Sequence, residues 1–481
     1  MTKILEPYGA SQSARRFHGT AMLIIVLSYL AVLVIPQRSY DIYLAYGRAA
    51  IIAAAAIYFW NYRLSGGIEV RLVIYYAAWV LISRILNTDY YLQNELDLVI
   101  TRFLCAVVLP VGVILEREER ERLLDVLIAV SGAFFLVGAL LGIYACVFGV
   151  YFYVGPESTS FGIDSSYLLD YFYYVVAFGT NRTVSAVWFY LELCFMVYEF
   201  FKCRNKLWRI PICLAGFVFY LTIGLCFCRS IKFAVCINAA MLVVLGIMGI
   251  KKKLSPILKL VLMAAASLAV MVCVYKSFDV LNSGLAAIYN SMDVQIERTS
   301  DAFMMPEYFD TVENGQTLAD TRDLGKSVSN MSLRGEIFAS VIPTMKLDPM
   351  RLVIGKYSSK IMDIPRQFMS YPFFHMHNYL IQVLMLTGIL GFALVLVFSV
   401  LIVVKCIRYF FSSDEKATLH SKMLIMPLAG YFMYGMMEVL MFTLSADDRA
   451  PTDFRELVFF LLCGIFLGYY KEVFPGKKKN V

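Results

Sequence analysis

The stretch HMHNYLIQVLMLTGILGF, residues 375–392, decides the fold, because a polar segment with two histidines passes directly into a long apolar run. A run of about 20 apolar residues is long enough to cross the hydrocarbon core of a membrane as a helix. Asn378 stands at the junction, and asparagine is a preferred N-cap residue. We therefore expect a transmembrane helix that begins at Asn378.

The rest of the chain repeats this pattern. Of its 481 residues, 60% are hydrophobic and only 16% are charged, and the mean hydropathy is +0.69. Such a chain has too few charges to cover a soluble globule of this size. We expect an all-α polytopic membrane protein of about twelve helices, which begin near Thr20, Ile42, Val70, Leu98, Leu123, Val184, Trp208, Ile231, Pro256, Asn378, Met423 and Phe454.

Lysine and arginine predict the orientation of these helices. When the two tails and the short loops are sorted into two alternating sets, 24 of the 43 basic residues fall in one set and 6 in the other. The basic set, which includes both tails, is expected to face the cytoplasm. The net charge of +7 then reflects this bias rather than affinity for nucleic acid.

The predicted organisation has three parts. Residues 1–275 form a membrane body of nine helices, residues 276–376 a large extracytoplasmic loop with short amphipathic helices, and residues 377–481 the last three helices with a cytoplasmic tail. Within the loop, acidic residues dominate 279–323 and basic residues dominate 326–366. The basic half is either a solvated surface with uneven charge or an anion site.

One amphipathic helix is expected in the loop segment SLRGEIFASVIP, residues 332–343. Ser332 could cap it and Pro343 would end it. Arg334 would then lie near its N-terminal end. Its apolar face would consist of Leu333, Ile337, Val341 and Ile342.

His375 and His377 are the first candidates for chemistry, because an ordinary histidine pKa suits proton transfer at neutral pH. They precede Asn378 at a predicted helix N-terminus, whose partial positive charge favours a neutral imidazole that can accept a proton. The alternative is a pair of histidines tolerated at a membrane interface.

Three arginines on the predicted outer side form the second candidate group. Arginine binds phosphate oxygens in pairs and stays charged where burial is costly. Arg182 and Arg229 lie at the outer ends of predicted spans, and Arg334 lies in the loop. Arg229 has almost no loop around it, so we expect it at membrane depth or at the edge. The alternatives are interfacial anchors and ion pairs between helices.

Further charges fall inside predicted spans. Arg48, Arg84 and Arg102 could line the same cavity, or could pair with nearby acids. Glu438 could pair with an arginine or bind a sugar hydroxyl, and pairing is the simpler expectation. We find no motif for a metal-bound nucleotide sugar, a metalloprotease or a nucleophile elbow, so no metal is predicted.

These residues resemble the O-antigen ligase and O-antigen polymerase superfamily of bacterial membrane glycosyltransferases. HMHNYLIQVLMLTGILGF is similar to the family's His-Asn, Leu-Gln and Gly-x-x-Gly signature after its large external loop. NRTVSAVWFY, LTIGLCFCRSIKFAV and SLRGEIF resemble the family's three arginine-containing segments. Cys228 stands where a serine is usual before Arg229, and Ser185 where a glycine is expected after Arg182.

The resemblance implies a GT-C-like fold and transfer of a glycan from a polyprenyl-pyrophosphate carrier to an acceptor hydroxyl. The reaction would take place on the outer face of the cytoplasmic membrane of a bacterium, without a metal or other cofactor. His377 would be the base, Arg229 and Arg334 catalytic cations, and Arg182, His375, Asn378 and Glu438 substrate-binding residues.

Three activities remain open at this point. A polymerase would use another carrier-linked repeat unit as acceptor, and is the reading we favour. A ligase would use lipid A core or another acceptor. A flippase for lipid-linked oligosaccharide would also hold pyrophosphate with arginines, but would spread its charged residues through the middle of many spans.

Overall fold

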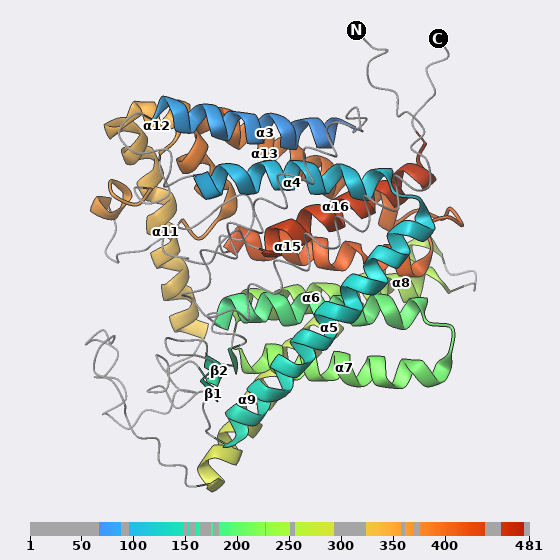
Figure 1. Ribbon diagram of the computed structural model, residues 1–481. Coiled ribbons are helices and arrows are strands. Elements are labelled where there is room, and N and C mark those ends of the chain that lie inside the picture. Colours follow the sequence, from blue (N-terminus) through green and yellow to red (C-terminus); the bar gives the residue numbers. More distant parts are fainter. Residues whose placement is uncertain are drawn as a thin grey trace. The chain divides into compact units, whose positions relative to one another are not determined.

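The computed structural model describes residues 67–87, 96–148, 152–153, 160–163, 175–176, 182–226, 228–250, 255–292, 324–356, 361–368, 376–437 and 454–475. All long elements in this part of the chain are helices (Figure 1). The chain divides into two compact units, Met1–Leu127 with Val328–Val481, and Ile128–Ser327. We call them the first and the second unit. The predicted division at residues 276 and 377 separates the membrane helices from the extracytoplasmic loop. It stays a prediction.

The first unit contains the described part of the histidine-bearing segment, residues 376–392, and the helices around it. Helices α3, α4, α13, α15 and α16 run alongside one another, and α11 crosses their direction at a steep angle (Figure 1). Helix α5, Arg117–Phe148, begins in this unit. The other elements are α3 Ile68–Leu86, α4 Leu96–Ile114, α11 Leu324–Leu347, α12 Pro349–Ile354, the short 3₁₀ helix η6 Pro365–Phe368, α13 Tyr379–Phe410, α14 Leu419–Met423, α15 Ile425–Met437 and α16 Phe454–Val473.

Two glycines let α4 and α16 approach each other closely. A Cβ added at Gly112 would clash with the backbone of Gly464 and Ile465, and one added at Gly464 would clash with the carbonyl of Leu109. Small residues at such contacts are typical of membrane helices, where van der Waals packing drives association. Helix α16 is accordingly buried almost throughout.

The second unit contains α6 Arg182–Lys202, α7 Lys206–Leu225, α8 Arg229–Met248 and α9 Pro256–Met292. Helix α6 packs on α7, and α8 packs on α9. Between α5 and α6 lies a small antiparallel sheet, in which Phe152 pairs with Phe161 and Gly162 with Val176. Its strands are β1 Phe152–Tyr153, β2 Ser160–Ile163 and β3 Val175–Val176. The sequence did not predict this sheet.

The helical membrane-protein class is confirmed. Within the described residues, five helical segments are long and apolar enough to cross a membrane. They are Arg117–Tyr144, Lys206–Leu225, Arg229–Met248, Pro256–Leu281 and Tyr379–Phe410. The predicted starts near Thr20 and Ile42 lie outside the described residues. The count of about twelve spans, the side of each loop and the cytoplasmic location of both termini stay predictions.

The loop helix differs from its prediction. Helix α11 begins eight residues before Ser332 and continues four residues beyond Pro343, so neither residue ends the helix. Proline lacks one backbone N–H, but tertiary packing can keep a helix intact around it. Ile337 is buried, as expected, whereas Ile342 is 67% exposed. Ser340 and Thr344 take its place on the buried face.

Candidate functional site

Helix α13 contains a sharp break at the Gly-x-x-Gly segment. Gly388 has non-helical backbone angles, with φ 69°. Gly355, which follows α12, also has a positive φ of 74°. A Cβ at Gly388 would clash with the backbone of Val353, and a Cβ at Gly355 with that of Leu386. Only glycine fits both requirements, so α12 and α13 meet backbone to backbone at this break.

Side chains of α3 bind the carbonyls that the break leaves without helical partners. Trp79 Nε1 donates to Thr387 O at 2.7 Å. Arg84 donates from Nη2 to Leu386 O and from Nη1 to Lys356 O, both at 2.8 Å. Irregular backbone within a membrane requires such internal partners. Two further bonds join the segments, from Ser83 Oγ to Ile354 O and from Lys356 N to Met385 O.

These contacts assign Arg84 a structural role. It is 1% exposed, and two backbone carbonyls accept hydrogen bonds from it. Arg102 is also structural, since it pairs with buried Glu456 of α16. The contacts therefore support pairing with an acid for Arg102, and for Arg84 they show hydrogen bonds to backbone carbonyls. Arg48 lies outside the described residues.

Asn378 caps α13, as the sequence predicted. Its Oδ1 accepts hydrogen bonds from the backbone N–H groups of Leu380 at 3.0 Å and Ile381 at 3.2 Å. Its Nδ2 donates to the carbonyl of Met436 in α15 at 3.0 Å. The cap thus fixes both the start of α13 and its position against α15.

His377 directly precedes this cap and has a strained backbone. Its φ is 46°, and it is the one non-glycine residue with positive φ in the described part of the chain. The left-handed region is costly for a residue with a Cβ. Strain of this kind gathers at functional sites, where the surroundings hold it in place. His377 is half-buried, between buried Met376 and buried Asn378.

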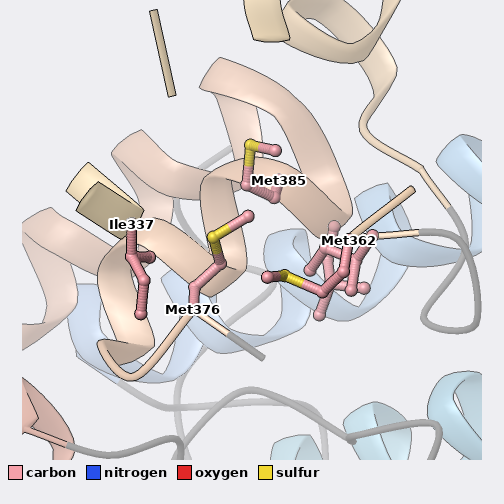
Figure 2. Packing of buried hydrophobic residues seen from close by; sticks show 6 residues of the cluster. Ile337, Met362, Met376 and Met385 are labelled. Carbon is pink, nitrogen blue, oxygen red and sulfur yellow. The ribbon is translucent and has the colours of Figure 1, made fainter. Parts of the chain in front are cut away.

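A methionine-rich apolar cluster lies beneath this turn. Figure 2 shows Met376 beside Ile337 of α11, Met385 of α13 and Met362, which precedes η6. Ile361 and Leu386 complete the buried cluster. The cluster therefore ties three segments together at the start of α13: helix α11, the residues before η6, and the turn that holds His377.

Two cations of the basic loop half have structural partners. Arg351, 1% exposed, lies 3.5 Å from Asp348 and donates to Ile361 O at 3.1 Å. Lys356 lies 3.7 Å from the same carboxylate. Burial lowers the pKa of the Arg351 guanidinium, and Asp348 and Asp363 oppose that shift. Arg351 and Lys356 thus have partners around α12, a role that neither alternative for the basic half had named. The anion site and the solvated surface both stay predictions.

Arg229 is the first residue of α8 and is exposed. Lys232 follows in the same turn, 7% exposed, with Nζ 5.3 Å from the ring centroid of Phe278 in α9. A helix N-terminus carries partial positive charge, so each cation there costs about 0.3–1 kcal/mol. Two cations in that turn are unfavourable for the isolated helix and favourable for a bound anion.

The remaining candidates are only partly described. Arg182 is the first residue of α6 and Arg334 lies within α11, one turn before Ile337, but the side chains of both arginines lie outside the described part. His375 and Glu438 also lie outside it. Within the described ranges no three metal-binding residues come together. The absence of a metal and of a cofactor stays a prediction.

Taken together, these features define a polytopic helical membrane protein with a strained, capped histidine at the start of a broken helix. Residues 214–396 match the family model described as O-Antigen ligase. This match supports the resemblance to the O-antigen ligase and polymerase superfamily. The match includes Arg229, Arg334, His377 and Asn378. No curated protein matches the chain.

Sequence reasoning missed the break in α13 and its partners in α3. The only local signal was the Gly-x-x-Gly spacing of Gly388 and Gly391 in an otherwise apolar span. Gly391 has its own reason, since a Cβ there would clash with the side chain of Thr387. Both glycines therefore serve the architecture beneath the histidine.

Proposed function

We propose that this protein is a glycosyltransferase that moves a glycan from a polyprenyl-pyrophosphate carrier to an acceptor hydroxyl at the outer face of the bacterial cytoplasmic membrane. The most favoured form of the reaction is polymerisation of polysaccharide repeat units. The observation that carries the proposal is His377, strained and anchored on both sides, within the residues that match the family model.

The proposed reaction needs one base and several cations. The acceptor oxygen attacks the anomeric carbon of the donor sugar, and the bond from that carbon to the pyrophosphate oxygen breaks. The hydroxyl proton passes to the His377 imidazole, and the polyprenyl pyrophosphate leaves with its negative charge. A positioned base of this kind contributes about 10²–10⁴-fold to a rate.

Arg229 is our proposed ligand for the leaving pyrophosphate, and Arg182 and Arg334 are proposed to assist. The support is the first turn of α8, which contains the two cations Arg229 and Lys232. A helix N-terminus carries partial positive charge, so cations there are unfavourable unless an anion binds. Guanidinium groups bind phosphate oxygens with two parallel hydrogen bonds, which stabilises charge as it develops. His375 and Glu438 are proposed to contact the sugars.

Transfer to a different acceptor, as in a ligase, is the second candidate, since the matching family model is described as O-Antigen ligase. Both reactions use the same donor and the same base, and differ only in the hydroxyl that attacks.

Purified protein incubated with a lipid-linked repeat unit, without nucleotide sugar, tests the proposal. A ladder of longer carrier-linked glycans would support polymerisation, and product only after addition of a separate acceptor would support ligation. If the protein only moves intact lipid-linked glycan across vesicle membranes and forms no new glycosidic bond, the proposal is wrong and a flippase is the better assignment.

A further inference from the structure

Gln382 lies on the first turns of α13, where it is fully buried in an apolar helix. Its Oε1 accepts a hydrogen bond from the backbone N–H of Met376 at 3.0 Å. Its own backbone N–H donates to Asn378 O at 2.9 Å. The side chain therefore reaches back across the cap and holds the residue before His377.

The side-chain amide of Gln382 carries a cost as well as a benefit. One neutral hydrogen bond contributes about 0.5–1.5 kcal/mol, whereas a buried donor without a partner costs about 1–3 kcal/mol. Gln382 Nε2 is such a donor, since it is buried and has no hydrogen-bond partner among the described residues. A leucine would fill a similar volume without that cost, but it would leave the backbone N–H of Met376 without its acceptor. What Gln382 provides is therefore the bond to Met376.

The benefit is apparent at His377. Met376 is held twice, by Gln382 at its N–H and by the apolar cluster at its side chain. Asn378 is held twice as well, by α13 and by the carbonyl of Met436. His377 lies between these two fixed residues with φ 46°, a conformation that needs support from both sides.

We infer that Gln382 is a positioning residue for His377: its side-chain carbonyl fixes the strained turn that aims the imidazole at the acceptor hydroxyl. The inference rests on the proposed function, because it gives His377 the role of base. Gln382 contacts the base only through the backbone and is not itself a catalytic residue. A displacement of about 1 Å of a catalytic group can lower a rate about 10²-fold.

Three variants test the inference, each purified in detergent and assayed for transfer from lipid-linked repeat units. Gln382→Leu removes the acceptor for Met376 N–H and is expected to lower kcat about 10–100-fold, with KM within about threefold of wild type. Gln382→Glu retains an acceptor oxygen at the same place and is expected to keep kcat within about fivefold. Thr387→Val is the matched control.

Thr387 suits that purpose because it is equally buried on the same helix. Its Oγ1 donates to Val383 O, one turn back along α13, and also shares a hydrogen bond with the Tyr76 hydroxyl of α3. Neither partner belongs to the His377 turn, so we expect its loss to leave that turn unchanged. Thr387→Val should keep wild-type kcat. Membrane level and thermal unfolding temperature are measured for all three variants, so that a general loss of stability is recognised.

Two results would overturn the inference: wild-type kcat in Gln382→Leu, or a stable Gln382→Glu that has lost kcat as completely as Gln382→Leu. If Gln382→Leu fails to fold, the Gln382→Glu result alone decides. His377→Ala separates this failure from that of the proposed function. Inactive His377→Ala with active Gln382→Leu rejects only the positioning role, whereas active His377→Ala rejects the base and the positioning role together.

Discussion

Helix α13 has a histidine near each end, and the two differ in how the protein holds them. His420, in α14 beyond the C-terminal end, is held through its ring: Nε2 lies 3.2 Å from Thr418 Oγ1 and 3.4 Å from Glu121 Oε1. His377, at the N-terminal end, has a strained backbone and lies between two neighbours, Met376 and Asn378, that hydrogen bonds fix.

The difference separates a structural histidine from a candidate base. Glu121, the partner of His420, also accepts from Arg117 at 3.2 Å and from Tyr469 at 3.4 Å, so the His420 ring is one member of a polar network. Each ion pair or hydrogen bond in a partly exposed network of this kind contributes little to the stability of the fold. At His377 the protein instead holds a costly backbone conformation, and such strain gathers at functional sites.

The largest expected effect is that of His377→Ala. Removal of the proposed base should lower the transfer rate about 10²–10⁴-fold, while the protein remains in the membrane at its normal level. Transfer is measured with purified protein and lipid-linked glycan, and level by quantitative immunoblot. A rate close to that of wild type would remove His377 from the mechanism.

Gly388→Ala tests the architecture beneath the histidine. The added Cβ would clash with the Val353 backbone and would stand at a positive φ, so we expect a loss of stability greater than about 2 kcal/mol. Thermal unfolding in detergent measures it. Gly246→Ala in α8 is the control, because nothing lies within 4 Å of the added Cβ and alanine favours a helix. Equal unfolding temperatures for the two variants would contradict the break in α13.

Arg229→Lys tests the proposed pyrophosphate contact. Lysine keeps the charge but loses the paired hydrogen bonds of the guanidinium, so the expected loss in kcat/KM is about tenfold, or about 1.4 kcal/mol. Arg209→Lys in α7 is a suitable control, since Arg209 binds the carbonyl of Cys203 at the predicted cytoplasmic side. A wild-type rate in Arg229→Lys would favour an interfacial anchor.

His420→Ala should have the smallest effect. Loss of its contacts with Thr418 and Glu121 is expected to reduce stability by less than about 1 kcal/mol and to leave the transfer rate within about twofold. Differential scanning fluorimetry and the same transfer assay measure the two effects. A loss of rate as large as that of His377→Ala would show that the comparison between the two histidines is wrong.

Hydropathy and capping rules predicted much of this structure because both depend on neighbouring residues. The helix that begins at Tyr379 follows Asn378, and Pro256 begins α9, as the local pattern indicates. The same rules failed for α11, where packing of Ile337 against Met376 and Met385 overrides the stop signal at Pro343.

The support beneath the site could not be predicted from local pattern. The carbonyls at Leu386 and Thr387 receive their partners from Arg84 and Trp79, about three hundred residues earlier in the chain. The positive φ of His377 likewise depends on hydrogen bonds made by Gln382 and Asn378. The presence of a histidine at this position does not predict that conformation. The candidate residues could be chosen from the chemistry of their side chains and their order along the chain. Their conformation depends on tertiary contacts.

The most direct test of the central claim is the transfer rate of His377→Gly with and without added imidazole. Glycine accepts φ 46° without strain, so this variant should be as stable as wild type or more stable by about 1 kcal/mol. We predict a rate about 10²–10⁴-fold below that of wild type, partly restored by imidazole that replaces the missing base. A His377→Gly variant that transfers glycan at the wild-type rate without imidazole would contradict the account.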